Sequence, residues 1–262
     1  MIDSVESVEV DGLQLRVRVV GDGPHTLLLL HGWMATSAIW DDLVAHLDLK
    51  GRRLLLPDLR GCGGSSAPDD VAGYSLDRFT ADNVAILDAF GVDSAVVVGN
   101  SMGGQLALVL AAMHPARVSG VLGLCPVPTT GIPLPDDARG LFSSSGGDRG
   151  KQNTILGLAS PTMTDAVKHR LLDDAGGIDP AAIAAVFAAW SAGVDVDLGR
   201  ITAPTLVIGT DDPFLPAAFL NGAIVVQVPQ ARFAYLPGPG HYPQVERPAE
   251  TAAVVNAFLA GR

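Results

Sequence analysis

The chain has 262 residues, of which 48% are hydrophobic and 17% are charged, and its formal net charge at pH 7 is −11. This composition is typical of a globular protein and excludes a disordered one, while the acidic balance disfavours nucleic acid and anionic membranes, which both bind basic surfaces. No apolar run reaches membrane-spanning length, and the first residues lack a basic region followed by an apolar stretch, so the sequence predicts neither a membrane span nor a signal peptide.

Two cysteines, Cys62 and Cys125, are too few for a disulfide framework, so we expect a cytoplasmic protein. The sequence contains no paired Cys or Cys/His cluster for zinc and no EF-hand loop. No phosphate-binding glycine motif follows a predicted strand. We therefore expect no metal and no cofactor, and a small molecule as the partner of the protein. The sequence leaves the oligomeric state open.

The first half of the chain alternates predicted strands with predicted helices. Residues 6–10 and 13–20 alternate apolar and polar side chains around Asp11-Gly12, a pair that is typical of a two-residue hairpin turn. Ser75 is the expected cap of a long amphipathic helix. In chain order, strands are predicted at 6–10, 13–20, 26–30, 53–56, 96–99 and 118–125, and helices at 38–47, 76–90 and 105–113.

The composition changes between residues 126 and 200. Several prolines come first, and a flexible polar segment is predicted at 143–150. We interpret residues 127–200 as a helical cap, or lid, inserted into a single domain that spans residues 1–262. The remaining predicted elements are helices near 155–158, 165–173 and 180–190, strands at 205–209 and 232–236, and a closing helix at 249–259. This alternation of strands and helices predicts an α/β fold with a parallel sheet that is covered on both faces.

The motif Gly99-x-Ser101-x-Gly103 joins a β-branched strand to an apolar helix. A sharp strand-to-helix turn of this kind exposes the serine hydroxyl above the sheet, and a β-carbon at either glycine would collide with neighbouring elements. The backbone N–H of Met102 then points at the group that the hydroxyl attacks. The alternative is that Ser101 only caps the helix, but the strand before it and the helix after it favour a nucleophile.

A serine nucleophile needs a base, and the base needs a carboxylate that orients it. His31 and His241 are the histidines that follow predicted strands with glycine beside them, and ligands bind at the carboxyl ends of such strands. His241 lies in a loop rich in proline and glycine, which suits the base. The strand that ends before Pro126 supplies no acid, so the residues leave Asp211 and Asp212 as alternatives for the carboxylate.

The chain resembles the α/β-hydrolase superfamily over nearly its whole length. The segments that carry this resemblance are His31-Gly32-Trp33, Asp58-Leu59-Arg60-Gly61-x-Gly63-x-Ser65, Gly99-Asn100-Ser101-Met102-Gly103-Gly104, Gly209-x-x-Asp212-x-x-x-Pro216 and Gly240-His241. The resemblance implies the α/β-hydrolase fold, with a mostly parallel central sheet, helices on both faces and a small helical cap. It also implies that Ser101, Asp212 and His241 form a catalytic triad in that chain order.

The same resemblance assigns the oxyanion hole to the backbone N–H groups of Trp33 and Met102, and gives His31 and the Asp58 loop structural roles. The resulting hypothesis is a serine hydrolase that cleaves a small, uncharged, apolar ester or lactone through an acyl-enzyme on Ser101. The residues expected to line its substrate pocket are Met34, Phe142, Trp190, Phe214, Leu215 and Tyr242, together with the Trp33 side chain.

Several other activities remain alternatives at this stage. Gly-Asn-Ser-Met-Gly-Gly is also similar to the nucleophile motif of hydrolases that break C–C bonds in ring-cleavage products. Cofactor-free haloperoxidases or perhydrolases share the same triad, and cofactor-free ring dioxygenases use this fold with the His–Asp pair as base. Ser101 argues against relatives that use an aspartate nucleophile, such as haloalkane dehalogenases. A non-enzymatic ligand receptor on the same fold is the alternative from another functional class.

Overall fold

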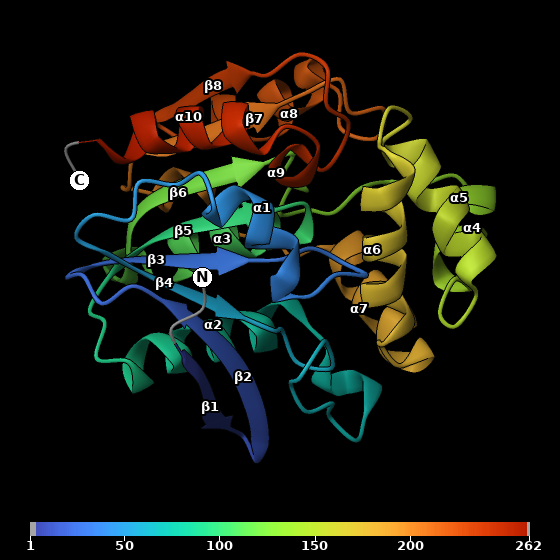
Figure 1. Cartoon of the computed structure of the whole chain (residues 1–262), viewed down its shortest axis with the longest axis horizontal. Coiled ribbons are helices and arrows are strands. Elements are labelled where there is room, and N and C mark those ends of the chain that lie inside the picture. The colour runs from blue at the N-terminus through green and yellow to red at the C-terminus, as the bar shows by residue number, and fades with distance from the viewer. Residues whose placement is uncertain (1–3, 261–262) are drawn as a thin grey trace.

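A single eight-stranded sheet runs through the computed structural model, which describes residues 4–260 (Figure 1). Its strand order is β1-β2-β4-β3-β5-β6-β7-β8. The strands are β1 (Ser4–Val10), β2 (Leu13–Val20), β3 (His25–Leu30), β4 (Arg52–Pro57), β5 (Ala95–Asn100), β6 (Val118–Leu124), β7 (Thr205–Gly209) and β8 (Ala231–Tyr235). The β1–β2 and β2–β4 pairs are antiparallel and every other pair is parallel, which confirms the mostly parallel sheet predicted from the sequence.

The sheet is covered on both faces because its central strands are apolar on both sides. In β3, Leu28 and Leu30 belong to one core cluster, whereas Leu27 and Leu29 belong to the other, and all four are at most 1% exposed. Alternate residues of a strand face opposite sides, so both clusters need a layer of helices. Helices α2 (Leu76–Ala89) and α3 (Met102–Met113) contribute to the first cluster, and α1 (Asp41–Val44) and α10 (Pro248–Leu259) contribute to the second.

Four helices lie between β6 and β7, at the end of the molecule toward which the strands point (Figure 1). They are α4 (Asp136–Ser143), α5 (Arg149–Ala159), α6 (Asp165–Gly176) and α7 (Pro180–Ala192); the two short helices α8 (Ala217–Ala223) and α9 (Pro243–Glu246) follow later in the chain. No single helix among the described residues is both long and apolar enough to cross a bilayer, and α6 with α7 reaches that composition only as a pair bent by 102°.

The structure corrects the predicted helices in two places. Helix α4 was not expected. In the segment 143–150, which was expected to be flexible and polar, Ser145 is fully buried and Asp148 caps α5 through the N–H of Lys151, while most of the other residues are exposed. The predicted helix at 38–47 is shorter, with a 3-10 turn before α1. After Val44 the N–H groups of His46 and Leu47 donate three residues back, to Leu43 and Val44, and no longer four residues back as in an α-helix.

The loop after β4 is built around the buried carboxylate of Asp58. Oδ1 accepts the N–H of Ser37 at 2.7 Å, and Oδ2 accepts the N–H of Gly64 and the Arg16 guanidinium, both at 2.9 Å. Gly63 has a φ of 53°, and a β-carbon there would lie 2.4 Å from Oδ2. Only glycine therefore allows the loop to close around the carboxylate.

The environment of Asp58 lowers its pKa below the ordinary value of 3.8. Burial alone acts in the opposite direction, but the hydrogen bond from Gly64, the charge that His31 carries when it is protonated, and the contacts with Ser37 outweigh it. A carboxyl group whose pKa is depressed by folding stabilises the protein above its unfolded pKa, and that contribution is lost as the pH falls through the folded pKa.

We expect Asp58→Asn to lower the free energy of unfolding at pH 7 by about 1.5–3 kcal/mol, because charge-assisted hydrogen bonds to a carboxylate are replaced by an amide that cannot accept from every donor. The difference from the wild type should shrink as the pH falls below the unfolded pKa of 3.8 and through the lowered pKa of the folded carboxyl. Urea unfolding across this pH range measures both effects. The exposed Asp69→Asn is the control, and a difference that stayed constant with pH would contradict the assignment.

Candidate active site

Ser101 occupies a sharp turn between β5 and α3. Its φ of 58° is unusual for a residue with a side chain and marks a strained backbone. A β-carbon at Gly99 would lie 2.1 Å from the carbonyl oxygen of Gly103, and one at Gly103 would lie 1.9 Å from that of Leu30. The two glycines of the motif are therefore required by the close approach of β5, α3 and β3, and the turn holds Ser101 at the carboxyl edge of the sheet.

The loop after β3 passes directly beside Ser101. A β-carbon built at Gly32 would lie 3.0 Å from Cβ and 3.6 Å from Oγ of the serine. Trp33 follows in this loop, and Met102 is the first residue of α3. Neither backbone N–H has a hydrogen-bond acceptor within residues 4–260. Two unpaired donors thus belong to the residues that follow Gly32 and Ser101, an arrangement suited to binding an oxyanion.

His31 holds the start of this loop. Its Nε2 accepts the N–H of Leu59 at 2.9 Å, so the ring proton lies on Nδ1, which donates to the carbonyl of Gly32 at 2.8 Å. Burial lowers the pKa of His31, partly offset by the charge of Asp58, and the ring is therefore neutral. Because both ring nitrogens are engaged, His31 is not free to act as a base, in agreement with the structural role implied by the sequence.

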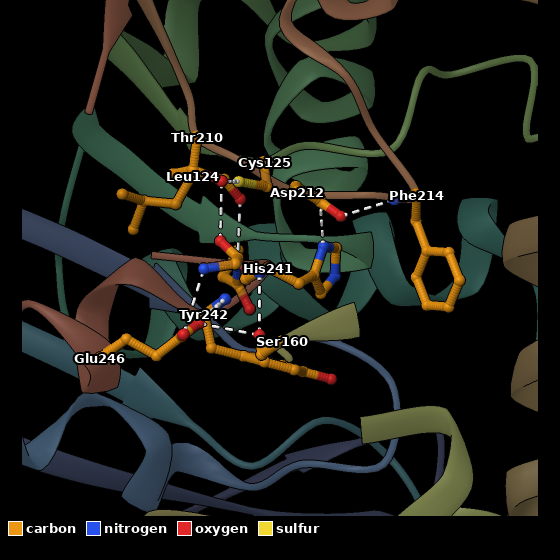
Figure 2. Close-up of polar contacts among 11 residues, drawn as sticks. Leu124, Cys125, Ser160, Thr210, Asp212, Phe214, His241, Tyr242 and Glu246 are labelled. Atoms are coloured by element: carbon orange, nitrogen blue, oxygen red, sulfur yellow. Dashed lines mark hydrogen bonds and ion pairs between the residues drawn. The ribbon is translucent and has the colours of Figure 1, made fainter. Parts of the chain in front are cut away.

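Asp212 and His241 form a buried pair in which Oδ2 lies 2.6 Å from Nδ1 (Figure 2). Oδ1 of the same carboxylate accepts the N–H of Phe214 at 2.8 Å. An ionised carboxylate only accepts hydrogen bonds, so Nδ1 carries the imidazole proton and Nε2 keeps its lone pair. The second aspartate, Asp211, is exposed and accepts instead from the hydroxyl of Tyr235 and the N–H of Gly238, which lower its pKa. Of the two neighbouring carboxylates, the structure therefore brings Asp212, the one implied by the resemblance, to His241.

Ser101 and His241 line one cavity of about 70 Å³. No direct hydrogen bond joins their side chains in the described part of the chain. The remaining lining residues are apolar or aromatic: Trp33, Val127, Ile132, Leu134, Phe142, Ile155, Ala159, Trp190, Phe214, Leu215 and Tyr242. This cavity includes every residue expected in the pocket except Met34.

The prediction for Met34 is wrong in detail. Met34 has a φ of 55° and is buried, and its sulfur lies 3.8 Å from the hydroxyl of Ser145, away from the lining of the cavity. The five lining residues missed by the sequence analysis are Val127, Ile132, Leu134, Ile155 and Ala159. All five belong to the 127–200 insertion, where only the larger aromatic side chains had been singled out.

Aromatic rings pack the side of the cavity that faces the insertion. The rings of Trp33 and Phe142 stack at 5.3 Å, and Phe142 meets Phe214 edge-on at 5.7 Å. The indole N–H of Trp33 donates to the carbonyl of Ile183 in α7 at 2.8 Å, whereas the buried indole N–H of Trp190 has no partner within residues 4–260. The loop beside Ser101 is thereby joined to the inserted helices through a side chain.

Cys125, Asp212 and His241 are the residues that come closest to a metal site, with donor atoms within 4.8 Å of one another. Burial raises the pKa of the Cys125 thiol well above its ordinary range, and the charge of Asp212 raises it further. Thr210 donates its hydroxyl proton to the carbonyl of Gly240, so it can only accept from the thiol, 3.2 Å away. A metal ligand would have to be a thiolate, so this environment favours a protonated thiol and does not fit a metal centre.

A model of the family described as alpha/beta hydrolase fold matches residues 25–152 of the chain. Over 97% of its length the chain is 27% identical to "Epoxide hydrolase A" of Mycobacterium tuberculosis (strain ATCC 25618 / H37Rv), of which it covers 96%. Other relatives named epoxide hydrolase match 45% to 47% of the chain, which covers only 35% to 39% of their own length.

Solved structures extend the comparison to the whole fold. A bromoperoxidase from Bacillus anthracis superimposes with a TM-score of 0.88 over 98% of this chain and 99% of that one, and at 22% identity this likeness concerns the fold. An N-acyl homoserine lactone degrading enzyme superimposes with a TM-score of 0.83 and 27% identity, over 97% of this chain and 100% of that one. The chain therefore has the α/β-hydrolase fold and is an enzyme of the α/β-hydrolase type.

Proposed function

We propose that this protein is a serine hydrolase that cleaves small, uncharged esters or lactones through an acyl-enzyme intermediate. The observation that carries the proposal is the placement of Ser101 on a strained turn, with the unpaired N–H groups of Trp33 and Met102 in adjoining positions and with the Asp212–His241 pair at the same cavity. These are the parts that acyl transfer requires: a nucleophile, an oriented base and donors for the oxyanion.

In this mechanism the Ser101 hydroxyl attacks the carbonyl carbon while Nε2 of His241 takes its proton. Asp212 holds the imidazole in the required tautomer and stabilises its cation. The backbone N–H groups of Trp33 and Met102 bind the oxyanion, and the loss of one such donor typically costs about 3 kcal/mol of transition-state stabilisation. His241 then protonates the leaving alcohol and activates the water that releases the acid.

The cavity lining supports a small and uncharged substrate. No Lys, Arg, Asp or Glu is present among the lining residues, and an ionised substrate group buried there would lack a partner for its charge. Its volume of about 70 Å³ is far below the roughly 300–1,000 Å³ of sites for drug-sized ligands. Short acyl or alkyl groups fit such a site.

The nucleophile separates this proposal from the activity in the name of the Mycobacterium relative. A serine that opened an epoxide would form an ether, which contains no carbonyl carbon for an activated water to attack. An acyl-serine does contain one, so Ser101 supports turnover of esters and lactones but not of epoxides.

We also propose that residues 127–200 act as a cap that selects the substrate. Phe142 of α4, Ile155 of α5 and Trp190 of α7 all line the cavity, and Trp33 hydrogen-bonds to α7. The inserted helices therefore supply much of the wall that an acyl chain would contact.

We expect Ser101→Ala to abolish covalent labelling by a fluorophosphonate and to lower the hydrolysis of p-nitrophenyl acetate by about 10⁴-fold or more, because the nucleophile is lost. Labelling is read by mass spectrometry and hydrolysis by nitrophenol release, with the exposed Ser143→Ala as the control. Labelling that survived the substitution would contradict the assignment. A wild-type protein that bound esters but released less than one product per chain would be a receptor.

Asp212→Asn should reduce kcat for the same ester by about 10⁴-fold, since an amide stabilises the wrong imidazole tautomer. Asp211→Asn is the matched control, because its side chain is exposed and contacts Tyr235 instead of His241. Steady-state kinetics of the two variants show which aspartate supports His241. Equal losses, or a larger loss for Asp211→Asn, would show that the pair seen in the structure does not carry the reaction.

Replacing Trp190 by Ala should shift the preference from acetyl toward longer acyl chains, since the truncation enlarges the cavity. Phe142→Leu should have the same effect to a smaller extent. The ratio of kcat/KM for p-nitrophenyl hexanoate and acetate should change by about 10-fold or more for the larger truncation, because one or two methylenes in an apolar pocket are worth 1–3 kcal/mol. An unchanged ratio accompanied only by a lower melting temperature would show that these residues pack the core.

A further inference from the structure

The backbone of His241 is held by side chains from two distant parts of the chain. Its N–H donates to the hydroxyl of Ser160 at 2.9 Å and to the carbonyl of Ala159 at 3.1 Å, while its carbonyl accepts the side-chain amide of Asn100 at 3.0 Å (Figure 2). Asn100 is the last residue of β5, directly before Ser101. Ser160 caps the end of α5 and belongs to the insertion. The loop between β8 and α9 that carries His241 (residues 236–242) is called the histidine loop below. It thus lies between β5 and the inserted helices.

Glu246, at the end of α9, closes this arrangement from the other side. Oε1 accepts the hydroxyl of Ser160 at 2.8 Å and the N–H of Tyr242 at 3.1 Å, and Oε2 accepts the N–H of Gly240 at 3.1 Å (Figure 2). No Lys, Arg or His forms an ion pair with Glu246 among the residues that the structure describes. Its carboxylate is used instead to bind the two loop residues that flank His241.

The directions of these hydrogen bonds are mutually consistent. Ser160 has one hydroxyl proton, which it donates to Glu246, so its oxygen is left to accept the N–H of His241. Ser160 is fully buried. A β-carbon at Gly240 would lie 2.6 Å from both the Ala159 carbonyl oxygen and the Ser160 hydroxyl, so the loop and the end of α5 are in direct contact.

We propose that Ser160 and Glu246 are positioning residues that fix His241, so that the position of His241 depends on the packing of α5 against the histidine loop. This inference rests on the proposed hydrolase function. Neither side chain lines the cavity, so both act through the histidine loop and not on the substrate. Displacement of the inserted helices from the sheet would remove the hydrogen bond to the His241 N–H and free the loop on which the base is carried.

The experiment compares Glu246→Gln and Ser160→Ala, called the clamp variants below, with two controls of the same chemistry. Glu250→Gln alters an exposed glutamate paired with Arg247, and Ser144→Ala removes an exposed hydroxyl in the insertion. Glutamine at position 246 keeps one acceptor oxygen, which cannot serve Gly240 and Tyr242 together, so at least one donor beside His241 loses its partner. Active sites are counted by fluorophosphonate labelling, so that kcat refers to competent protein only.

We expect both clamp variants to lower kcat by about 10- to 100-fold, as small displacements of a catalytic group do, with little change in KM for p-nitrophenyl acetate. The double variant should lose no more than the more severe single variant, because the two residues act as one unit. The control variants should retain wild-type kcat. A lower melting temperature with unchanged kcat per labelled site would overturn the proposal, since it would indicate a merely structural role.

A second readout does not depend on the substrate. The Nδ1 proton of His241, in a short hydrogen bond to Asp212, should give a low-field proton NMR signal that His241→Ala removes. In the clamp variants this signal should broaden or vanish through exchange, and in the controls it should persist. If the wild type hydrolysed no ester but this pattern held, the proposed function would fail and the positioning role would stand. If labelling and turnover were normal and the signal were identical in all four variants, the positioning role alone would fail.

Discussion

The strained backbone of Ser101 is the constraint on which the rest of the site depends. A serine at a φ of 58° persists only if its surroundings leave no lower-energy conformation. Here Gly99 and Gly103 approach neighbouring backbone so closely that no β-carbon fits at either position. The rigid sheet therefore determines where the hydroxyl lies, and the other functional groups are brought to it.

Two loops beside Ser101 are held in place by different hydrogen bonds. The loop after β3 is fixed at its start by the ring of His31 on the N–H of Leu59, and further along by the N–H of Ser37 on the Asp58 carboxylate. The histidine loop is fixed by Asn100, whose side-chain amide bonds the carbonyls of both Leu124 and His241. The Oδ1 atom of Asn100 itself has no partner within residues 4–260, but the buried hydrogen bonds of these loops make a rigid and specific arrangement, which is what preorganised catalysis requires.

The inserted helices contribute to the site in two distinct ways. Phe142 and Trp190 supply apolar wall, so they bear on which substrate fits. The end of α5 contacts the backbone of His241 directly, so it bears on where the base is held. The proposed cap and the proposed positioning of the base thus both depend on the inserted helices and the residue that follows α5.

The sequence by itself determined the features that depend on local periodicity and on short motifs. The continuous apolar strands and the glycines around Ser101 predicted a parallel sheet and its strand-to-helix turn, because strand burial and backbone crowding act over a few residues. The strand ends narrowed the acid to Asp211 or Asp212, two neighbours with the same chemistry, and only the resemblance to the family motif favoured Asp212. Helix ends were less predictable, since α1 ends at Val44, where the following N–H groups donate three residues back, and no residue in the sequence marks that change.

Only the tertiary structure decided which of these groups meet. It turned Asp212 toward His241 and left Asp211 exposed against Tyr235. It also removed Met34 from the cavity and brought Ser160 to the histidine loop, 81 residues away in sequence. Contacts of this kind depend on the directions of side chains at the ends of separate strands and on the packing of the inserted helices. Neither has a local signature, because each is set by hydrogen bonds and excluded volume between segments that become neighbours only when the sheet has formed.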